Sequence, residues 1–146
     1  MVAATYADYA EIDEFEETIK AWRRGEVDDT TFRGQRLHMG TYGIRNSDAH
    51  MIRVKVPGGL LEPDHLDAVA DIAEAHSRGF AHLTTRQNFQ VHFVETDEVP
   101  ALMRRLADAG LTTREACGNS VRTITQSHPR GREPEAAAGT APAAEA

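Results

Sequence analysis

The fold of this chain is decided by a strictly alternating stretch, Met51-Ile52-Arg53-Val54-Lys55-Val56. Its three apolar β-branched side chains share one parity, and Arg53 and Lys55 share the other. Because successive side chains of a strand point to opposite faces of a sheet, this pattern predicts a half-buried strand. Pro57-Gly58-Gly59 follows at once and is typical of a turn that ends the strand.

Downstream of this strand, helical and extended periodicities alternate. A helix is predicted from Pro63 to about Gly79, with an apolar stripe of Leu66, Val69, Ala70 and Ala73. Residues 80–86 predict a second strand and residues 89–93 a third, joined in a hairpin by the turn Arg86-Gln87-Asn88. A second helix begins at about Asp97, with an apolar face of Val99, Leu102, Met103, Leu106 and Ala107. Gly110 ends that helix, and a further extended segment is predicted from Ser120 to Thr125.

The resulting order is β-α-β-β-α-β, which is the ferredoxin-like pattern of the α+β class, with both helices on one face of the sheet. An amphipathic helix over residues 9–24 precedes it, and residues 26–50 are interpreted as a connecting segment with several turns. The tail 129–146 is rich in Ala, Pro, Glu and Gly, and we expect it to be disordered.

Strand parity also predicts which side chains occupy the uncovered face of the sheet. If the helices cover Ile52, Val54, Val56, Leu83, Phe89, Val91 and Phe93, the other face presents Arg53, Lys55, His82, Thr84, Arg86, Gln90 and His92. Arg122 could join them from the last extended segment. Clustered cations repel one another by roughly 1 kcal/mol per pair at about 4 Å in water. The face therefore indicates binding of an anion or an acidic partner, with scattered surface charges as the alternative.

Composition excludes some classes of function. Residues 1–30 hold nine acidic and three basic residues, and residues 31–128 hold eleven of each, which disfavours nucleic-acid binding through bulk positive charge. The apolar runs are far shorter than the roughly 20 residues of a membrane span, and the first residues lack the features of a secretory signal. The single cysteine, Cys117, fits a reducing compartment. We expect a cytoplasmic protein that binds neither membranes nor nucleic acid.

Five motifs, in the same order, resemble those of the siroheme-dependent nitrite and sulfite reductases. They are Arg36-Leu37-His38-Met39-Gly40-Thr41-Tyr42-Gly43-Ile44-Arg45, Met51 to Gly59, His82-Leu83-Thr84-Thr85-Arg86-Gln87-Asn88-Phe89-Gln90-Val91-His92, Gly110-Leu111-Thr112-Thr113, and Ala116 to Thr125. The similarity covers roughly residues 12 to 126 and corresponds to the amino-terminal, ferredoxin-like half-domain region of that family.

This resemblance implies a six-electron reduction, of sulfite to sulfide or of nitrite to ammonia. The family's centre is a siroheme bridged through a cysteine thiolate to a 4Fe-4S cluster. Siroheme has many carboxylates, for which a basic sheet face is a suitable cradle. The resemblance indicates Arg53, Arg86 and Arg122 as contacts to siroheme carboxylates or to the substrate anion, with Lys55, Gln90 and His92 as further candidates. It assigns no catalytic residue, and the sequence shows no metal-ligand spacing of its own.

The chain also departs from the family. The family's cluster is held by four cysteines in the carboxy-terminal half, whereas this chain has only Cys117 and cannot hold the cluster alone. If the enzyme is split, we expect a complementary C-terminal half or subunit, and an electron donor such as ferredoxin or a flavoprotein. The expected division is a helix and connecting segment (1–46), the half-domain (47–115), the start of the siroheme-binding region (116–128) and the disordered tail (129–146).

Three other interpretations remain open. The chain could be a non-catalytic module that binds a tetrapyrrole or a small anion, a truncated remnant, or an RNA-binding domain with the same order of elements. An RNA-binding domain would need Phe89 and Phe93 on the uncovered face for base stacking, but strand parity directs both towards the helices.

Overall fold

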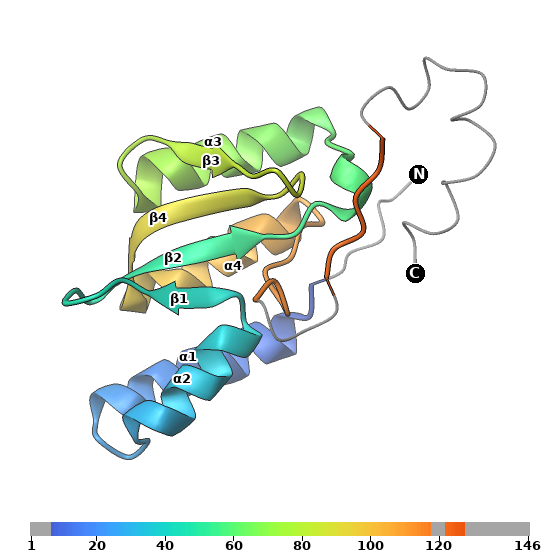
Figure 1. The fold of residues 1–146 in the computed structure, drawn as a ribbon. Helices are drawn as coiled ribbons and strands as arrows, with labels where there is room; N and C mark the ends of the chain where they lie inside the picture. The colour runs from blue at the N-terminus through green and yellow to red at the C-terminus, as the bar shows by residue number, and fades with distance from the viewer. Residues whose placement is uncertain (1–6, 118–121, 128–146) are drawn as a thin grey trace.

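The computed structural model describes residues 7–117 and 122–127, in which a single sheet has helices packed against one face (Figure 1). Its four antiparallel strands lie in the order β1-β2-β4-β3. In chain order the elements are α1 (Tyr9–Arg23), α2 (Asp29–His38), β1 (Thr41–Gly43), β2 (Ala49–Val54), a 3-10 turn (Pro57–Gly59), α3 (Pro63–His76), β3 (Ala81–Leu83), β4 (Phe89–Glu95), a second 3-10 turn (Thr96–Glu98) and α4 (Val99–Asp108). The predicted α+β class is confirmed.

The alternation in β2 positions the core as predicted. Ile52 is fully buried, as are the other two apolar residues of that parity, while Arg53 and Lys55 on the opposite face are half-buried. β4 supplies Val91 and Val94 to the same core, and α1, α3 and α4 pack over it. This covered face provides most of the buried apolar area and therefore most of the stability of the fold.

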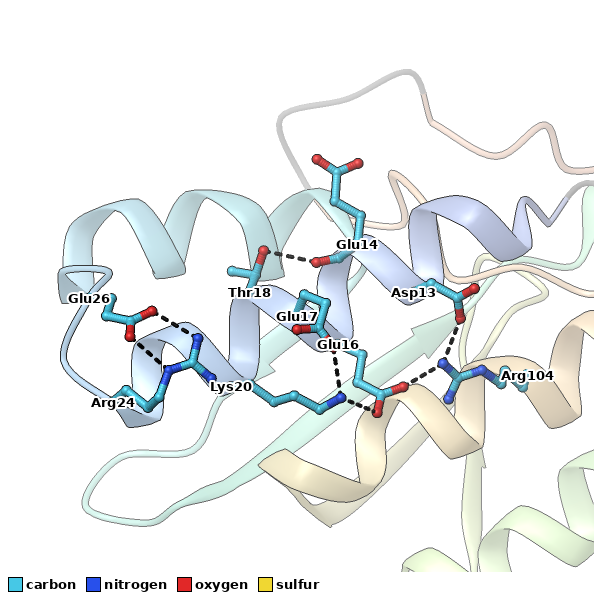
Figure 2. Close-up of polar contacts among 9 residues, drawn as sticks. All are labelled: Asp13, Glu14, Glu16, Glu17, Thr18, Lys20, Arg24, Glu26 and Arg104. Atoms are coloured by element: carbon cyan, nitrogen blue, oxygen red, sulfur yellow. Dashed lines mark hydrogen bonds and ion pairs between the residues drawn. The ribbon is translucent and has the colours of Figure 1, made fainter.

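Helices α1 and α4 also match their predicted positions. Asp8 caps α1 by accepting a hydrogen bond from the Ala10 amide, and every predicted apolar residue of α4 is buried. The two helices pack together and are joined on their outer side by an ion pair (Figure 2). The guanidinium of Arg104 in α4 contacts Glu16, and its Nη2 lies 2.7 Å from an Asp13 carboxylate oxygen in α1.

The predicted apolar stripe of α3 was partly wrong. Leu66 is 51% exposed and Ala70 is exposed, whereas Ile72, which the predicted stripe omitted, is 1% exposed. The helix turns its largest β-branched side chain into the core, and Ala68 lies beside it on the same face. The buried face is therefore rotated around the helix axis from the predicted one.

The expected connecting segment contains two further elements, α2 and β1. The Asp28 carboxylate caps α2 by accepting from the amides of Thr30 and Thr31, and Phe32 is the residue that α2 buries. With one buried side chain, two threonines and Gly34, α2 gives a weak helical signal in the sequence. The predicted turn at residues 46–48 is present and joins β1 to β2.

β1 is the fourth strand of the sheet, whereas the sequence had predicted the fourth strand after α4. It pairs with the free edge of β2, from Thr41 opposite Ile52 to Gly43 opposite His50. The described residues 122–127 form no strand, and the rest of the predicted strand, at 120 and 121, lies outside the described residues, as does the tail predicted to be disordered. Among its described residues, the chain after α4 makes a single β-bridge, Thr112 to Lys55.

A β-bulge interrupts the predicted parity of β4. His50 pairs with Val94 and Ile52 with Val91, so His92 and Phe93 together face one residue of β2. Phe93 has a φ of 64°, and Val94 takes the core position that parity had assigned to Phe93. Leu83 was also predicted to face the helices, but it is 72% exposed because β3 is a short edge strand.

Candidate functional site

A cavity of about 200 Å³ lies on the uncovered face, where β2 and the β3–β4 hairpin meet the chain after α4. Three of its lining residues are the arginines predicted from the sequence, Arg53, Arg86 and Arg122, and Gln90 is a fourth predicted residue. The remaining lining residues are Thr84, Thr85, Asn88, Phe89, Glu115, Ala116, Cys117 and Thr123. Residues separated by up to 70 positions in the sequence are thus brought together.

Arg53 comes from β2 and lies directly opposite Gln90 of β4 in the strand register. Its guanidinium carbon is 4.8 Å from the centre of the Tyr42 ring, which holds the side chain by a cation–π contact. The Nε atom is buried and has no hydrogen-bond partner among the residues that the structure describes. A buried donor without a partner is costly, so this atom indicates an acceptor supplied from outside the described chain.

Arg86 is positioned by the tight turn between β3 and β4. The Thr84 amide donates to the Asn88 carbonyl over 2.9 Å, and the Thr84 hydroxyl accepts from the amides of Asn88 and Arg86. Asn88 Oδ1 in turn accepts from the Val56 amide at 2.9 Å, which ties the turn to the end of β2. These bonds fix the backbone that presents Arg86 to the cavity.

Arg122 comes from the segment 122–127, which lies beside the connection between β2 and α3 (Figure 1). The Gly58 amide donates to the Ile124 carbonyl over 2.9 Å, and Gln87 hydrogen-bonds the backbone of Gln126. Arg122 itself is exposed. The segment therefore closes one side of the cavity with its arginine accessible to a ligand.

Two lining residues, Glu115 and Cys117, were not predicted as site residues. Glu115 adds one acid to three arginines, and its amide donates to the His38 carbonyl at 2.6 Å. Burial raises the pKa of the Cys117 thiol, against a hydrogen bond with Tyr42 that lowers it. A thiol with a raised pKa is protonated at neutral pH and is a poor nucleophile or metal ligand. The motif from Ala116 to Thr125 was the sequence signal that could have placed Cys117 at the site, and Glu115 directly precedes that motif.

The two remaining predicted residues, Lys55 and His92, do not line the cavity. Burial lowers the pKa of Lys55, while the neighbouring Glu115 carboxylate acts in the opposite direction. His92 packs 5.0 Å from the ring of His82 and 6.0 Å from that of Phe93. Burial, followed by the nearby His82, lowers the pKa of His92, and its Nε2 is buried without a partner among the described residues.

The model of the nitrite/sulfite reductase ferredoxin-like half domain matches residues 43–109. These residues form a half domain of that family. The match runs from the last residue of β1 to the residue after α4, so it contains β2, β3 and β4 and the helices α3 and α4.

Relatives of the half domain are sulfite and nitrite reductases. The chain is 40% identical over 74 residues to "Sulfite reductase [ferredoxin]" of Mycobacterium tuberculosis, which is 51% of this chain and 13% of that protein. It is 33% identical over 105 residues to "Ferredoxin--nitrite reductase" of Leptolyngbya laminosa, which is 70% of this chain and 21% of that protein.

The solved structure of the Mycobacterium tuberculosis NirA protein matches with a TM-score of 0.65 and 27% identity, over 83% of this chain and 28% of that one. The chain thus spans about a fifth or less of the length of these two curated relatives. The ferredoxin-like half-domain fold predicted from the sequence is confirmed.

Of the two cofactors that the family implies, the residues of this chain suit siroheme, with its carboxylates, better than the 4Fe-4S cluster. The cavity offers three guanidinium groups, one of which, that of Arg53, has an unpartnered Nε, and this donor set suits carboxylates. A 4Fe-4S cluster needs four thiolates, and the sequence has one cysteine. Among residues 7–117 and 122–127, no three His, Cys, Asp or Glu side chains gather as a metal site would require.

Two classes of function that the sequence disfavoured, RNA binding and membrane spanning, can be compared with this geometry. An RNA-binding domain would need both Phe89 and Phe93 on the uncovered face. The bulge takes Phe93 out of the core, but Phe89 is 6% exposed and belongs to the core. Within the described residues, no helix is both long and apolar enough to cross a bilayer.

Proposed function

We propose that the half domain provides the basic surface that binds siroheme carboxylates and the substrate anion in a sulfite or nitrite reductase. The observation that supports this function is the convergence of Arg53, Arg86 and Arg122 on one cavity. Three like charges in one cavity with a single acid, Glu115, are stabilised by a bound anion. A planar guanidinium also matches a carboxylate with two parallel hydrogen bonds, which a lysine cannot do.

The four predicted residues that line the cavity each have a defined part in this proposal. Arg53 and Arg86 hold carboxylates, Arg122 neutralises the substrate oxyanion or a further carboxylate, and Gln90 donates an amide hydrogen bond beside Arg53. Lys55 and His92 lie outside the cavity, and the proposal gives them no contact with the ligand. When bound, siroheme and the family's 4Fe-4S cluster would pass to the substrate the six electrons that an external donor provides.

The complete reaction requires more chain than the half domain. In the proposed division, 1–46 is a helix and connecting segment, 47–115 is the half-domain, 116–128 begins the siroheme-binding region and 129–146 is the tail. A complementary half or subunit would supply the cluster cysteines. Both of the curated relatives described above have ferredoxin in their names, which favours ferredoxin over a flavoprotein as the electron donor. The proposed location of the protein is the cytoplasm.

The test is siroheme binding, measured by titrating the purified chain and recording the absorption spectrum. Arg53→Ala, Arg86→Ala and Arg122→Ala should each lose about 1.5–3 kcal/mol of binding free energy, roughly tenfold to over a hundredfold in affinity. Arg45→Ala, in the exposed turn between β1 and β2, is the matched control and should bind as the unchanged chain does. Equal affinity of all four variants, with circular dichroism unchanged, would place the ligand elsewhere.

Catalysis gives a second test, which separates this proposal from a complete enzyme. With a reduced viologen as donor, the isolated chain should not turn over sulfite or nitrite, because it lacks the thiolates that hold the cluster. Siroheme binding without turnover by the isolated chain supports the proposed binding surface. If the chain binds siroheme but shows no activity even when a cluster-bearing half is supplied, it would instead be a non-catalytic tetrapyrrole-binding module.

A further inference from the structure

A reciprocal pair of hydrogen bonds joins the β3–β4 turn to the segment 122–127. Gln87 Nε2 donates to the Gln126 carbonyl oxygen at 2.7 Å, and the Gln126 amide donates to Gln87 Oε1 at 3.0 Å. The side-chain amide of Gln87 thus makes both hydrogen bonds that a neighbouring strand would make to this residue. We refer to this pair as the Gln87 clamp.

Two glycines leave the space in which the clamp forms. Gly58 and Gly59 have φ of 64° and 67°, which side chains rarely adopt. A Cβ atom on Gly58 would lie 2.6 Å from Gln126 Nε2, and one on Gly59 would lie 2.7 Å from Gln87 Oε1. The Pro57-Gly58-Gly59 turn, predicted only as the end of a strand, therefore also packs against the clamp.

The clamp lies between two of the arginines that line the cavity. Gln87 follows Arg86 in a turn fixed by Thr84, and Gln126 belongs to the short segment that begins with Arg122. Among the described residues, the other backbone bond that holds this segment is Gly58 to Ile124. A shift of the segment would move Arg122 relative to Arg86 and change the width of the cavity.

We infer that Gln87 is a positioning residue, which sets the spacing of Arg86 and Arg122 and thereby the affinity of the cavity for its anionic ligand. This inference rests on the proposed function of the cavity. Gln87 itself does not line the cavity. If Gln87 had only a structural role, it would stabilise the segment 122–127 without affecting the affinity for the ligand.

The clamp is tested first without any ligand, by amide hydrogen exchange followed by NMR in the 146-residue chain. In Gln87→Ala, the Gln126 amide should lose its protection and the Gly58 amide should exchange faster, while core amides such as that of Val91 should not change. Gln87→Asn is the second variant. Gln87 has a φ of 59°, which Asn tolerates, and the shorter Asn side chain cannot make both hydrogen bonds. Gln35→Ala, on the exposed surface of α2, is the matched control. Full protection of Gln126 in both Gln87 variants would overturn the inference.

The effect on the site is then measured by titration with siroheme. Gln87→Ala and Gln87→Asn should bind about threefold to tenfold more weakly than the unchanged chain, and Gln35→Ala should bind equally well. The decisive readout is a double-mutant cycle: Gln87→Ala should have little further effect when Arg122 is already replaced by Ala. Equal losses in both backgrounds would show a general structural effect and overturn the inference.

Failure of this inference is distinguishable from failure of the proposed function. If the unchanged chain does not bind siroheme, the proposed function fails, and the hydrogen-exchange result decides the clamp alone. If siroheme binds and only the Arg→Ala variants weaken it, the proposed function stands and Gln87 is not a positioning residue.

Discussion

The two faces of the sheet use alternate residues of the same strands for different purposes. In β2, Ile52 is 0% exposed under the helices, and its neighbour Arg53 lines the cavity on the other side. In β4, Val91 belongs to the core and Gln90 to the cavity. Stability therefore depends mainly on one parity and ligand binding on the other, so substitutions one residue apart should have separable effects.

Removing a core side chain should have the largest effect on stability. Ile52→Ala should lower the free energy of unfolding by about 2–5 kcal/mol, because it deletes buried methyl groups and leaves a cavity. Chemical denaturation followed by circular dichroism measures the change. Leu66→Ala, on the exposed part of α3, is the control and should change stability by less than about 0.5 kcal/mol. If the two variants lost similar stability, the face assigned as the core would be wrong.

The sequence predicted the covered face best where several apolar side chains repeat over a long element. The alternation in β2 and the five apolar residues of α4 each identify one buried face, and both were confirmed. The sequence-based prediction was wrong where a single tertiary contact determines the position of a residue or strand. Phe93 leaves the core because of a bulge, and β1 is a three-residue strand that depends on pairing with β2. Neither event has a periodic signal in the local sequence.

The candidate site was predictable in part for a related reason. Parity placed Arg53, Arg86 and Gln90 on one face, and all three line the cavity. It could not show that the same face divides into the cavity and a separate cluster of rings around His92. Glu115 reaches the cavity from the chain after α4, so strand parity gave no information about it.

A histidine buried on the covered face, His50, should make the free energy of unfolding depend on pH. His50 is 5% exposed, and burial first and Arg36 second lower its pKa from 6.5 to about 4. Between these values the unfolded chain binds more protons than the folded one, so stability should be full above pH 6.5 and fall as the pH drops towards 4. The total loss should reach up to about 3 kcal/mol.

His50→Gln isolates this effect, because an amide can still hydrogen-bond Thr96 but does not titrate. His50 Nδ1 lies 3.2 Å from Thr96 Oγ1 in the folded chain. Denaturation curves between pH 7 and pH 4 should show a smaller loss of stability in the variant. Carboxylates with lowered pKa values, such as Glu16, contribute equally to both proteins and cancel in the difference. Parallel pH profiles for the two proteins would contradict the prediction.

On the open face, exchanging one cation for another should have a smaller effect than removing it. Arg53→Lys keeps the charge but loses the planar fork and weakens the contact with Tyr42. Siroheme affinity should fall by about 1 kcal/mol, between the unchanged chain and Arg53→Ala, with little change in the free energy of unfolding. A lysine variant that binds as weakly as the alanine variant would mean that hydrogen-bond geometry, and not charge, dominates the site.

The smallest effect is expected from the ion pairs on the outer side of the helices (Figure 2). Arg104 contacts Asp13 and Glu16 across the α1–α4 interface, and its side chain is about one-third exposed. Because water screens such pairs, Arg104→Ala should lower the free energy of unfolding by about 0.2–1 kcal/mol, and by less in high salt. Arg24→Ala, whose partner Glu26 lies two residues away in the same segment, should cost still less. Neither variant should alter siroheme affinity, since neither residue lines the cavity. A change in affinity for Arg104→Ala would show that the acidic helix α1 communicates with the open face, and the separation of the two faces would then not hold.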